Sequence, residues 1–131
     1  MIEKTILSNL IYNDDFTRKA LPFLDESYFS DIVIRKIYKL INEFHLNYNQ
    51  CPTKEALLVE LDDSSGLSDD QVEQAKQVVN DFEEPTEEIK EWVLDKTEKF
   101  CQEKAVYNAI MDSIQIMDGK TTQDKGAIPE L

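Results

Sequence analysis

The sequence predicts an all-α protein: a compact bundle of five or six helices with a long C-terminal helix that projects as a pairing arm. Apolar residues recur at helical spacing along most of the 131 residues. Three glycines and four prolines are too few for a loop-rich β fold. Residues 86–118 contain neither glycine nor proline, so we expect one unbroken helix of roughly 50 Å there, at ~1.5 Å per residue.

The N-terminal third predicts three helical elements and a turn. One helix covers residues 2–12, where the apolar positions share a face. A short helix follows and stops at Pro22, since the residue before a proline disfavours helical geometry. One helical turn is expected to begin at Asp25. Ser30 stands where it can cap a third helix over residues 31–47.

Two shorter helices are expected in the middle of the chain. Thr53 follows the break at Pro52 and caps the first helix. Ser68 and Gln71 have the spacing of a capping box, which opens the second. The acidic segment 62–66 between them lacks the glycine that a calcium loop needs at its sixth position, so we expect a plain turn and no metal.

The long helix has clear boundaries and two unlike halves. Thr86 supplies an N-cap hydroxyl, and Gly119 stands where a glycine would end the helix. Over residues 86–104, 10 of 19 residues are charged, which is typical of a solvated helix with one buried stripe. Over residues 105–117, 9 of 13 residues are apolar, which is too many for one face.

The apolar half leaves two interpretations open. It is either the centre of the domain's own core, or a helix–helix interface with another chain or with residues outside this sequence. The interface hypothesis names these oligomer-interface residues: Val106, Tyr107, Ile110, Met111, Ile114 and Met117.

Charge argues against unaided nucleic-acid binding. The net charge is −13, and residues 49–131 carry 20 acids against 8 bases. An acidic surface repels phosphate, so tight direct DNA binding is not expected.

The residues that carry chemistry in enzymes are sparse. There is no phosphate-binding glycine loop and no zinc-ligand spacing, and His45 is the only histidine. Cys51 and Cys101 lack CxxC spacing and are expected as reduced thiols. We therefore expect no catalytic, cofactor-binding or metal-binding residues.

The sequence predicts neither a signal peptide nor a membrane span. The N-terminus does not resemble a signal peptide, and no apolar run approaches the ~20 residues of a membrane span. A cytoplasmic location without membrane contact is expected.

The last residues predict a linker and a continuation. Residues 120–126 are polar, and Pro129 suits the first turn of a further helix. The predicted organisation is a helical domain over residues 1–118 and, over residues 119–131, a linker with the start of another segment. The sequence is therefore expected to be a piece of a longer protein.

Several packing and capping segments carry a family resemblance. Residues 6–11 form part of the first predicted helix. An acidic-aromatic turn at 24–29 leads into a helix with a basic pair at 35–41. A proline-led helix at 52–61 and the segment 126–131 complete the pattern. With these features the chain resembles the N-terminal domain of DnaB-type replicative DNA helicases, above all those of T-even-like phages.

The resemblance implies a function in phage DNA replication. In such helicases this domain forms a collar on the hexameric ring, its terminal helices pair between subunits, and it docks the primase within the primosome; a helicase loader is a further candidate partner. ATP and Mg are expected only for a RecA-like ATPase domain that would follow Leu131. The fragment would then be no enzyme, within a parent that is an ATP-dependent DNA helicase. The alternative is a stand-alone acidic helical adaptor or inhibitor that binds a basic protein surface.

Overall fold

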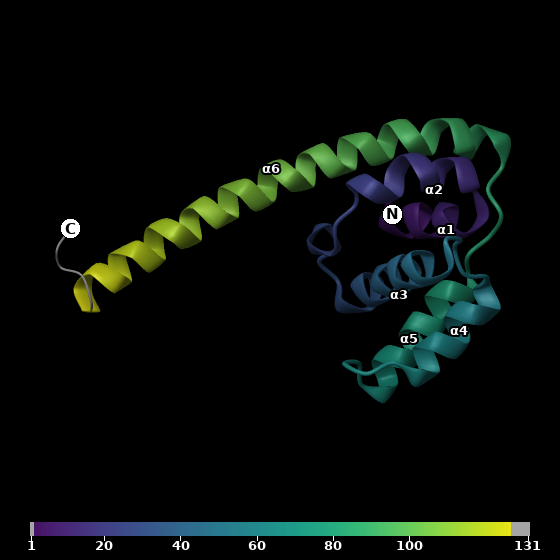
Figure 1. Ribbon diagram of the computed structural model, residues 1–131, viewed down its shortest axis with the longest axis horizontal. Helices are drawn as coiled ribbons and strands as arrows, with labels where there is room; N and C mark the ends of the chain where they lie inside the picture. Colours follow the sequence, from purple (N-terminus) through teal and green to yellow (C-terminus); the bar gives the residue numbers. More distant parts are fainter. Residues whose placement is uncertain (1, 127–131) are drawn as a thin grey trace. The chain divides into compact units, whose positions relative to one another are not determined.

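The chain folds entirely into helices and connections over the residues that the computed structural model describes, which are 2–126 for the backbone and 2–117 for the side chains. This confirms the predicted all-α class, with a long C-terminal helix (Figure 1). The elements are α1 (Ile2–Tyr12), α2 (Asp14–Ala20), η1 (Leu21–Phe23), η2 (Glu26–Tyr28), α3 (Ile32–Tyr48), α4 (Lys54–Asp63), α5 (Asp69–Asn80) and α6 (Glu87–Gly126), where η marks a 3-10 turn.

The chain divides into two compact units, Met1–Cys101 and Gln102–Leu131. The first contains α1 to α5 and the beginning of α6, and the second contains the remainder of α6. Among the described residues, no helix has the length and apolarity needed to cross a membrane.

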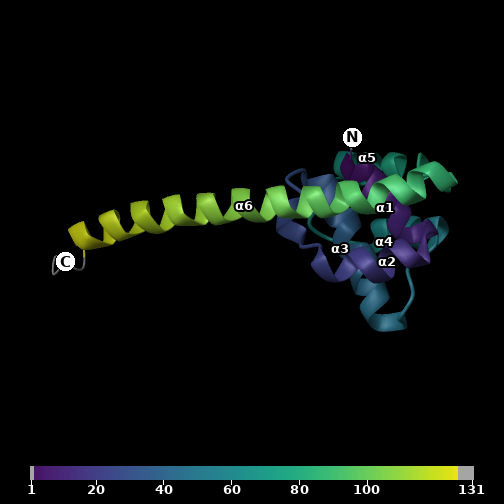
Figure 2. The same ribbon diagram turned by 90° about the horizontal axis from the view of Figure 1, so that it is seen from above.

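Helix α3 is the centre of the first unit. It packs against α1, α4, α5 and η2 (Figures 1 and 2). Ile37 and Ile41 of α3 are fully buried, as are Leu7 of α1, Leu57 of α4 and Val79 of α5. Burying a side chain of this size contributes about 1.5–3 kcal/mol, so this shared core is what holds these four helices together.

An aromatic cluster fixes the beginning of α6 to the rest of the first unit. The Phe100 ring lies 5.7 Å from the Phe29 ring and 6.5 Å from the Tyr28 ring, centroid to centroid. Phe29 also stacks on Tyr38 at 5.0 Å. The buried stripe predicted within residues 86–104 included Trp92, Val93 and Phe100. Val93 and Phe100 are buried as predicted, but the prediction is wrong for Trp92, which is 43% exposed.

Most predicted helix starts are confirmed by their capping bonds. Thr53 accepts a hydrogen bond from the Ala56 amide, and the Ser68–Gln71 capping box is complete. Thr86 accepts from the Ile89 amide at 3.4 Å.

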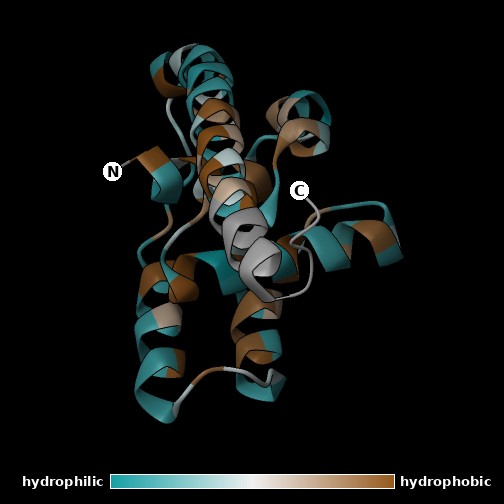
Figure 3. Ribbon diagram, turned by 90° about the vertical axis from the view of Figure 1, so that its left-hand side faces the viewer, coloured by the Kyte–Doolittle hydropathy of each residue, from teal (hydrophilic) through white to brown (hydrophobic). Residues whose placement is uncertain are grey.

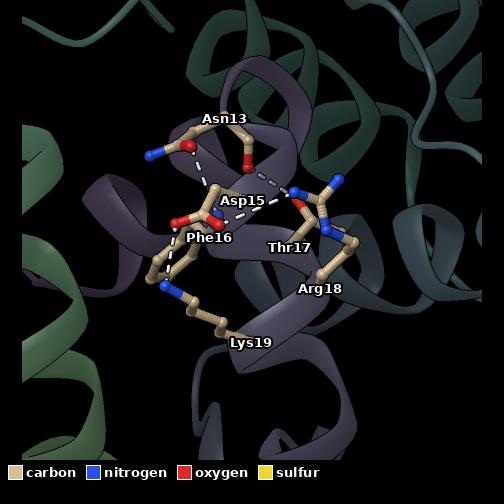
Figure 4. A network of polar contacts seen from close by, with 6 residues as sticks. All are labelled: Asn13, Asp15, Phe16, Thr17, Arg18 and Lys19. Carbon is tan, nitrogen blue, oxygen red and sulfur yellow. Dashed lines mark hydrogen bonds and ion pairs between the residues drawn. The ribbon is translucent and has the colours of Figure 1, made fainter.

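The turn between α1 and α2 is also capped by a side chain (Figure 4). Asn13 Oδ1 accepts from the Phe16 amide, while the Thr17 hydroxyl donates to the carbonyls of Leu10 and Asn13. Asp15 forms exposed ion pairs with Arg18 and Lys19, of the kind that contribute only tenths of a kcal/mol.

The cap expected at Ser30 is wrong. Asp31 caps α3 instead, and its Oδ1 accepts from the amides of Val33 at 2.8 Å and Ile34 at 3.2 Å. A carboxylate satisfies two unpaired amides at once and suits the positive end of the helix dipole better than a hydroxyl.

The helix end expected at Gly119 is also wrong. Helix α6 continues to Gly126, so residues 120–126 are helical rather than a linker. One glycine inside a helix costs only about 1 kcal/mol relative to alanine, and no proline follows before residue 126 to stop the hydrogen-bond ladder. The helix start expected at Pro129 lies outside the described residues, and the domain boundary expected after residue 118 stays a prediction.

Candidate functional site: an apolar face of helix α6

The second unit presents the six residues of the interface hypothesis on one helix. We call them the α6 apolar face: Val106, Tyr107, Ile110, Met111, Ile114 and Met117. All six side chains are exposed, from 36% at Met111 to 68% at Met117. The interpretation of this segment as the centre of the domain's core is therefore wrong for the described residues. Its interpretation as an interface remains a hypothesis.

The six residues lie together because their spacing follows the helix repeat. Tyr107, Ile110, Ile114 and Met117 are separated by three, four and three residues, which is the a/d spacing of a coiled-coil seam. Val106 and Met111 flank this seam. At about 100° per residue the six positions fall within an arc of roughly 140°, over a length of about 16 Å.

One large exposed apolar residue of the segment, Ile116, lies off this face. Ile116 is 68% exposed, and it occupies the c position of the same repeat, on another side of the helix. Ile116 therefore resembles Ile110 in chemistry and exposure but differs from it in direction. The hydropathy colouring of Figure 3 shows apolar turns along α6 between polar ones.

A lysine side chain contacts the α6 apolar face. The Lys104 Nζ lies 6.0 Å from the centroid of the Tyr107 ring, a cation–π contact that contributes about 0.5–1 kcal/mol at an exposed site. Lys104 was not among the predicted interface residues. Its spacing of three residues from an aromatic residue was the available signal, since such positions adjoin on a helix.

The titrating groups with displaced pKa values lie in the first unit. Burial raises the pKa of Tyr38 to about 12, and the Tyr38 hydroxyl donates to the Leu24 carbonyl. Burial also raises the pKa values of the Cys51 and Cys101 thiols. Both thiols are thereby kept in the protonated, weakly nucleophilic form at neutral pH. Among the described residues, no three potential metal ligands gather into a group.

The side chains of the exposed seam are suited to packing. Large apolar side chains at a and d positions pack against a second helix, and they carry no acid, base or nucleophile for catalysis. The α6 apolar face is therefore a candidate surface for helix pairing.

Comparison with known proteins agrees with the predicted resemblance. No protein-family model matches the chain. The chain is 29% identical over 135 residues to a DnaB-like replicative helicase from Enterobacteria phage T4. The similarity covers 96% of this chain but only 28% of the helicase, so the chain spans little more than a quarter of that relative's length. The predicted similarity to phage DnaB-type helicases is thus confirmed.

Proposed function

We propose that this chain is the assembly domain of a hexameric replicative DNA helicase that acts in phage DNA replication. In this proposal the first unit is a folded scaffold, and the α6 apolar face pairs with the same face of a second copy. Primase docking, and the binding of a helicase loader, would be further tasks of the assembled collar. ATP-driven unwinding would belong to a separate ATPase domain of the parent.

The observation that carries the proposal is the exposed α6 apolar face in a chain similar to a replicative helicase. The similarity extends over nearly the whole chain and supports a replicative role at the level of the family. Exposed apolar seams of this kind are unusual on proteins that act alone. Helix pairing between subunits would cover the seam.

The size of the face sets the expected strength of pairing. A symmetric pair would cover twelve half-exposed side chains, each contributing about 1 kcal/mol, for a gross gain of about 12 kcal/mol. Association costs an estimated 4–15 kcal/mol in lost freedom. The isolated pair should therefore be weak, with a dissociation constant in the micromolar range or above, and a hexamer would need additional contacts.

The acidic surface favours one second candidate, an adaptor that binds a basic protein surface. The net charge of −13 is the specific observation in its favour. An adaptor of this kind needs no pairing between copies, so self-association through α6 distinguishes the two functions.

Disulfide crosslinking tests the pairing directly. Cys51 and Cys101 are replaced by serine, and single cysteines are placed at Ile110, Ile114 or Ile116. Disulfides form only between Cα atoms about 4.4–6.8 Å apart. Parallel pairing predicts that the Ile110→Cys variant crosslinks with itself, whereas antiparallel pairing predicts crosslinking between Ile110→Cys and Ile114→Cys chains.

The control for this experiment is Ile116→Cys. The proposal predicts that it crosslinks at least tenfold more slowly than the better of the two arrangements on the apolar face. Equal crosslinking from all positions would indicate random collision and contradict the proposal.

A further inference from the structure

The first unit contains a pocket that shares no residue with the α6 apolar face. It is formed by α1, the end of α5, the connection between α5 and α6, and the first turn of α6, and its volume is about 330 Å³. Its lining includes Ser8 and Asn9 of α1 and the acidic residues Asp81, Glu83 and Glu84 of the connection. We call it the α1–α6 pocket. All of its lining residues belong to the first unit.

The connection that forms the pocket wall is fixed in place. The Ser8 hydroxyl donates to the Glu83 carbonyl at 2.9 Å, which ties the connection to α1. The Phe82 side chain is buried. The Phe82 amide donates to the Val79 carbonyl, and the Ile89 amide donates to Thr86 Oγ1. The wall is therefore held at both of its ends and in its middle, so a ligand would find a preformed site.

The charge of the pocket favours a cation. Asp81, Glu83 and Glu84 line it, against Lys4 on the basic side. The chain as a whole has a net charge of −13. A concave site lined by one sign of charge attracts the opposite sign more strongly than an open surface does.

A buried amide supplies an independent indication. Asn9 lines the pocket and is only 1% exposed, although Ile6 and Leu10 beside it on α1 are apolar core residues. Its Nδ2 donates to the Thr5 carbonyl at 2.9 Å, but within the described part of the chain its Oδ1 accepts no hydrogen bond. A buried acceptor without a donor is unfavourable. A donor that reaches Oδ1 from the pocket would remove that penalty.

We propose that the α1–α6 pocket binds an arginine side chain from a basic segment of a partner protein. A guanidinium group carries five N–H donors in a planar fork, so it has enough donors for a carboxylate and for the Asn9 amide oxygen. Its aliphatic stem would pack on Pro85 and Ile89, which also line the pocket. This interaction does not depend on the helicase assignment or on α6 pairing.

The test is an NMR titration of the ¹⁵N-labelled 131-residue chain with the peptide acetyl-Gly-Arg-Gly-amide. Shifts are expected at the Asn9 side-chain amide, at Ser8 and over residues 81–89. The citrulline analogue keeps the shape of the side chain but loses its charge, and should bind at least tenfold more weakly. Absence of shifts at these positions, or equal affinity for the two peptides, would overturn the proposal.

Two double variants distinguish binding in the pocket from attraction of the peptide to the acidic surface as a whole. The double variant Glu83→Gln and Glu84→Gln should weaken binding at least fivefold. The control Asp69→Asn and Asp70→Asn removes the same charge from the first turn of α5, outside the pocket lining, and should weaken binding less than twofold. An equal loss in both double variants would show attraction to the acidic surface as a whole and would refute the site.

A third variant examines the buried amide. Asn9→Leu should leave the far-ultraviolet circular dichroism and the melting temperature unchanged or raised, because leucine suits its apolar neighbours, and should weaken arginine-peptide binding at least fivefold. Unchanged affinity in this folded variant would remove Asn9 from the site. Because the carboxylate variants are at the surface, their result stands even if this core variant is unstable.

Discussion

Replacing Ile110 by aspartate separates pairing from folding. Ile110 is 55% exposed in the single chain, so its side chain contributes little to the stability of the monomer. Exposed substitutions usually change the free energy of unfolding by no more than about 0.5 kcal/mol. Ile110→Asp should therefore leave the circular dichroism spectrum and the thermal unfolding midpoint of the chain almost unchanged.

The same substitution should strongly weaken pairing. At a d position of a helix pair the carboxylate would be buried without a partner, and an uncompensated buried charge costs about 3–5 kcal/mol. Since every 1.4 kcal/mol is a factor of ten, the dissociation constant should rise by at least about a hundredfold. Sedimentation velocity at several concentrations measures this change.

Ile116→Asp is the matched control. It makes the same chemical change at a residue that is 68% exposed on another side of α6, and it should change the dissociation constant less than about threefold. Equal effects of the two variants would refute the proposed face. Unfolding by Ile110→Asp alone would instead mean that Ile110 belongs to a core.

Three further predictions concern the first unit. Asp31→Ala should lower the free energy of unfolding by about 1 kcal/mol in urea titrations, because the α3 cap is lost. Ser30→Ala should lower it less. A larger loss in Ser30→Ala than in Asp31→Ala would contradict the assignment of the cap. Phe100→Ala removes a buried ring and should cost about 3–5 kcal/mol by the same measurement, so a loss below 1 kcal/mol would contradict its place in the aromatic cluster. The folded pKa of Tyr38, about 12, is above the usual value of 10.0, so the folded state holds this proton more tightly. Stability from this group is complete below pH 10 and is lost as the pH rises toward 12; Tyr38→Phe should show a smaller loss over this interval, and an equal loss would contradict the assignment.

Most helices were predicted correctly because the caps and apolar spacing that define a helix involve residues only a few positions apart. Apolar spacing located α1, α3 and α5, and the side chains of Thr53 and Ser68 supply caps within three residues of the amides that they satisfy. The errors arose where two local signals compete. Asp31 prevailed over the adjacent Ser30, and the helix ladder continued through Gly119.

Burial and long-range contacts were not available from the same signals. The excess of apolar residues over residues 105–117 led to the six residues of the interface hypothesis, but composition alone could not decide between core and exposed surface, since both use the same residues. The α1–α6 pocket was missed because it joins Ser8 to Glu83, 75 positions apart. Asn9 on the apolar face of α1 was the one available sign of it.

The solution mass of the chain across a hundredfold dilution tests the assembly proposal most directly. Light scattering should begin at about 500 μM, because the estimated pairing is micromolar or weaker. If α6 pairs, the mass should rise with concentration from 15.2 kDa toward at least twice that value. Ile110→Asp should abolish this rise and Ile116→Asp should preserve it. A constant mass of 15.2 kDa at every concentration would contradict pairing through the α6 apolar face.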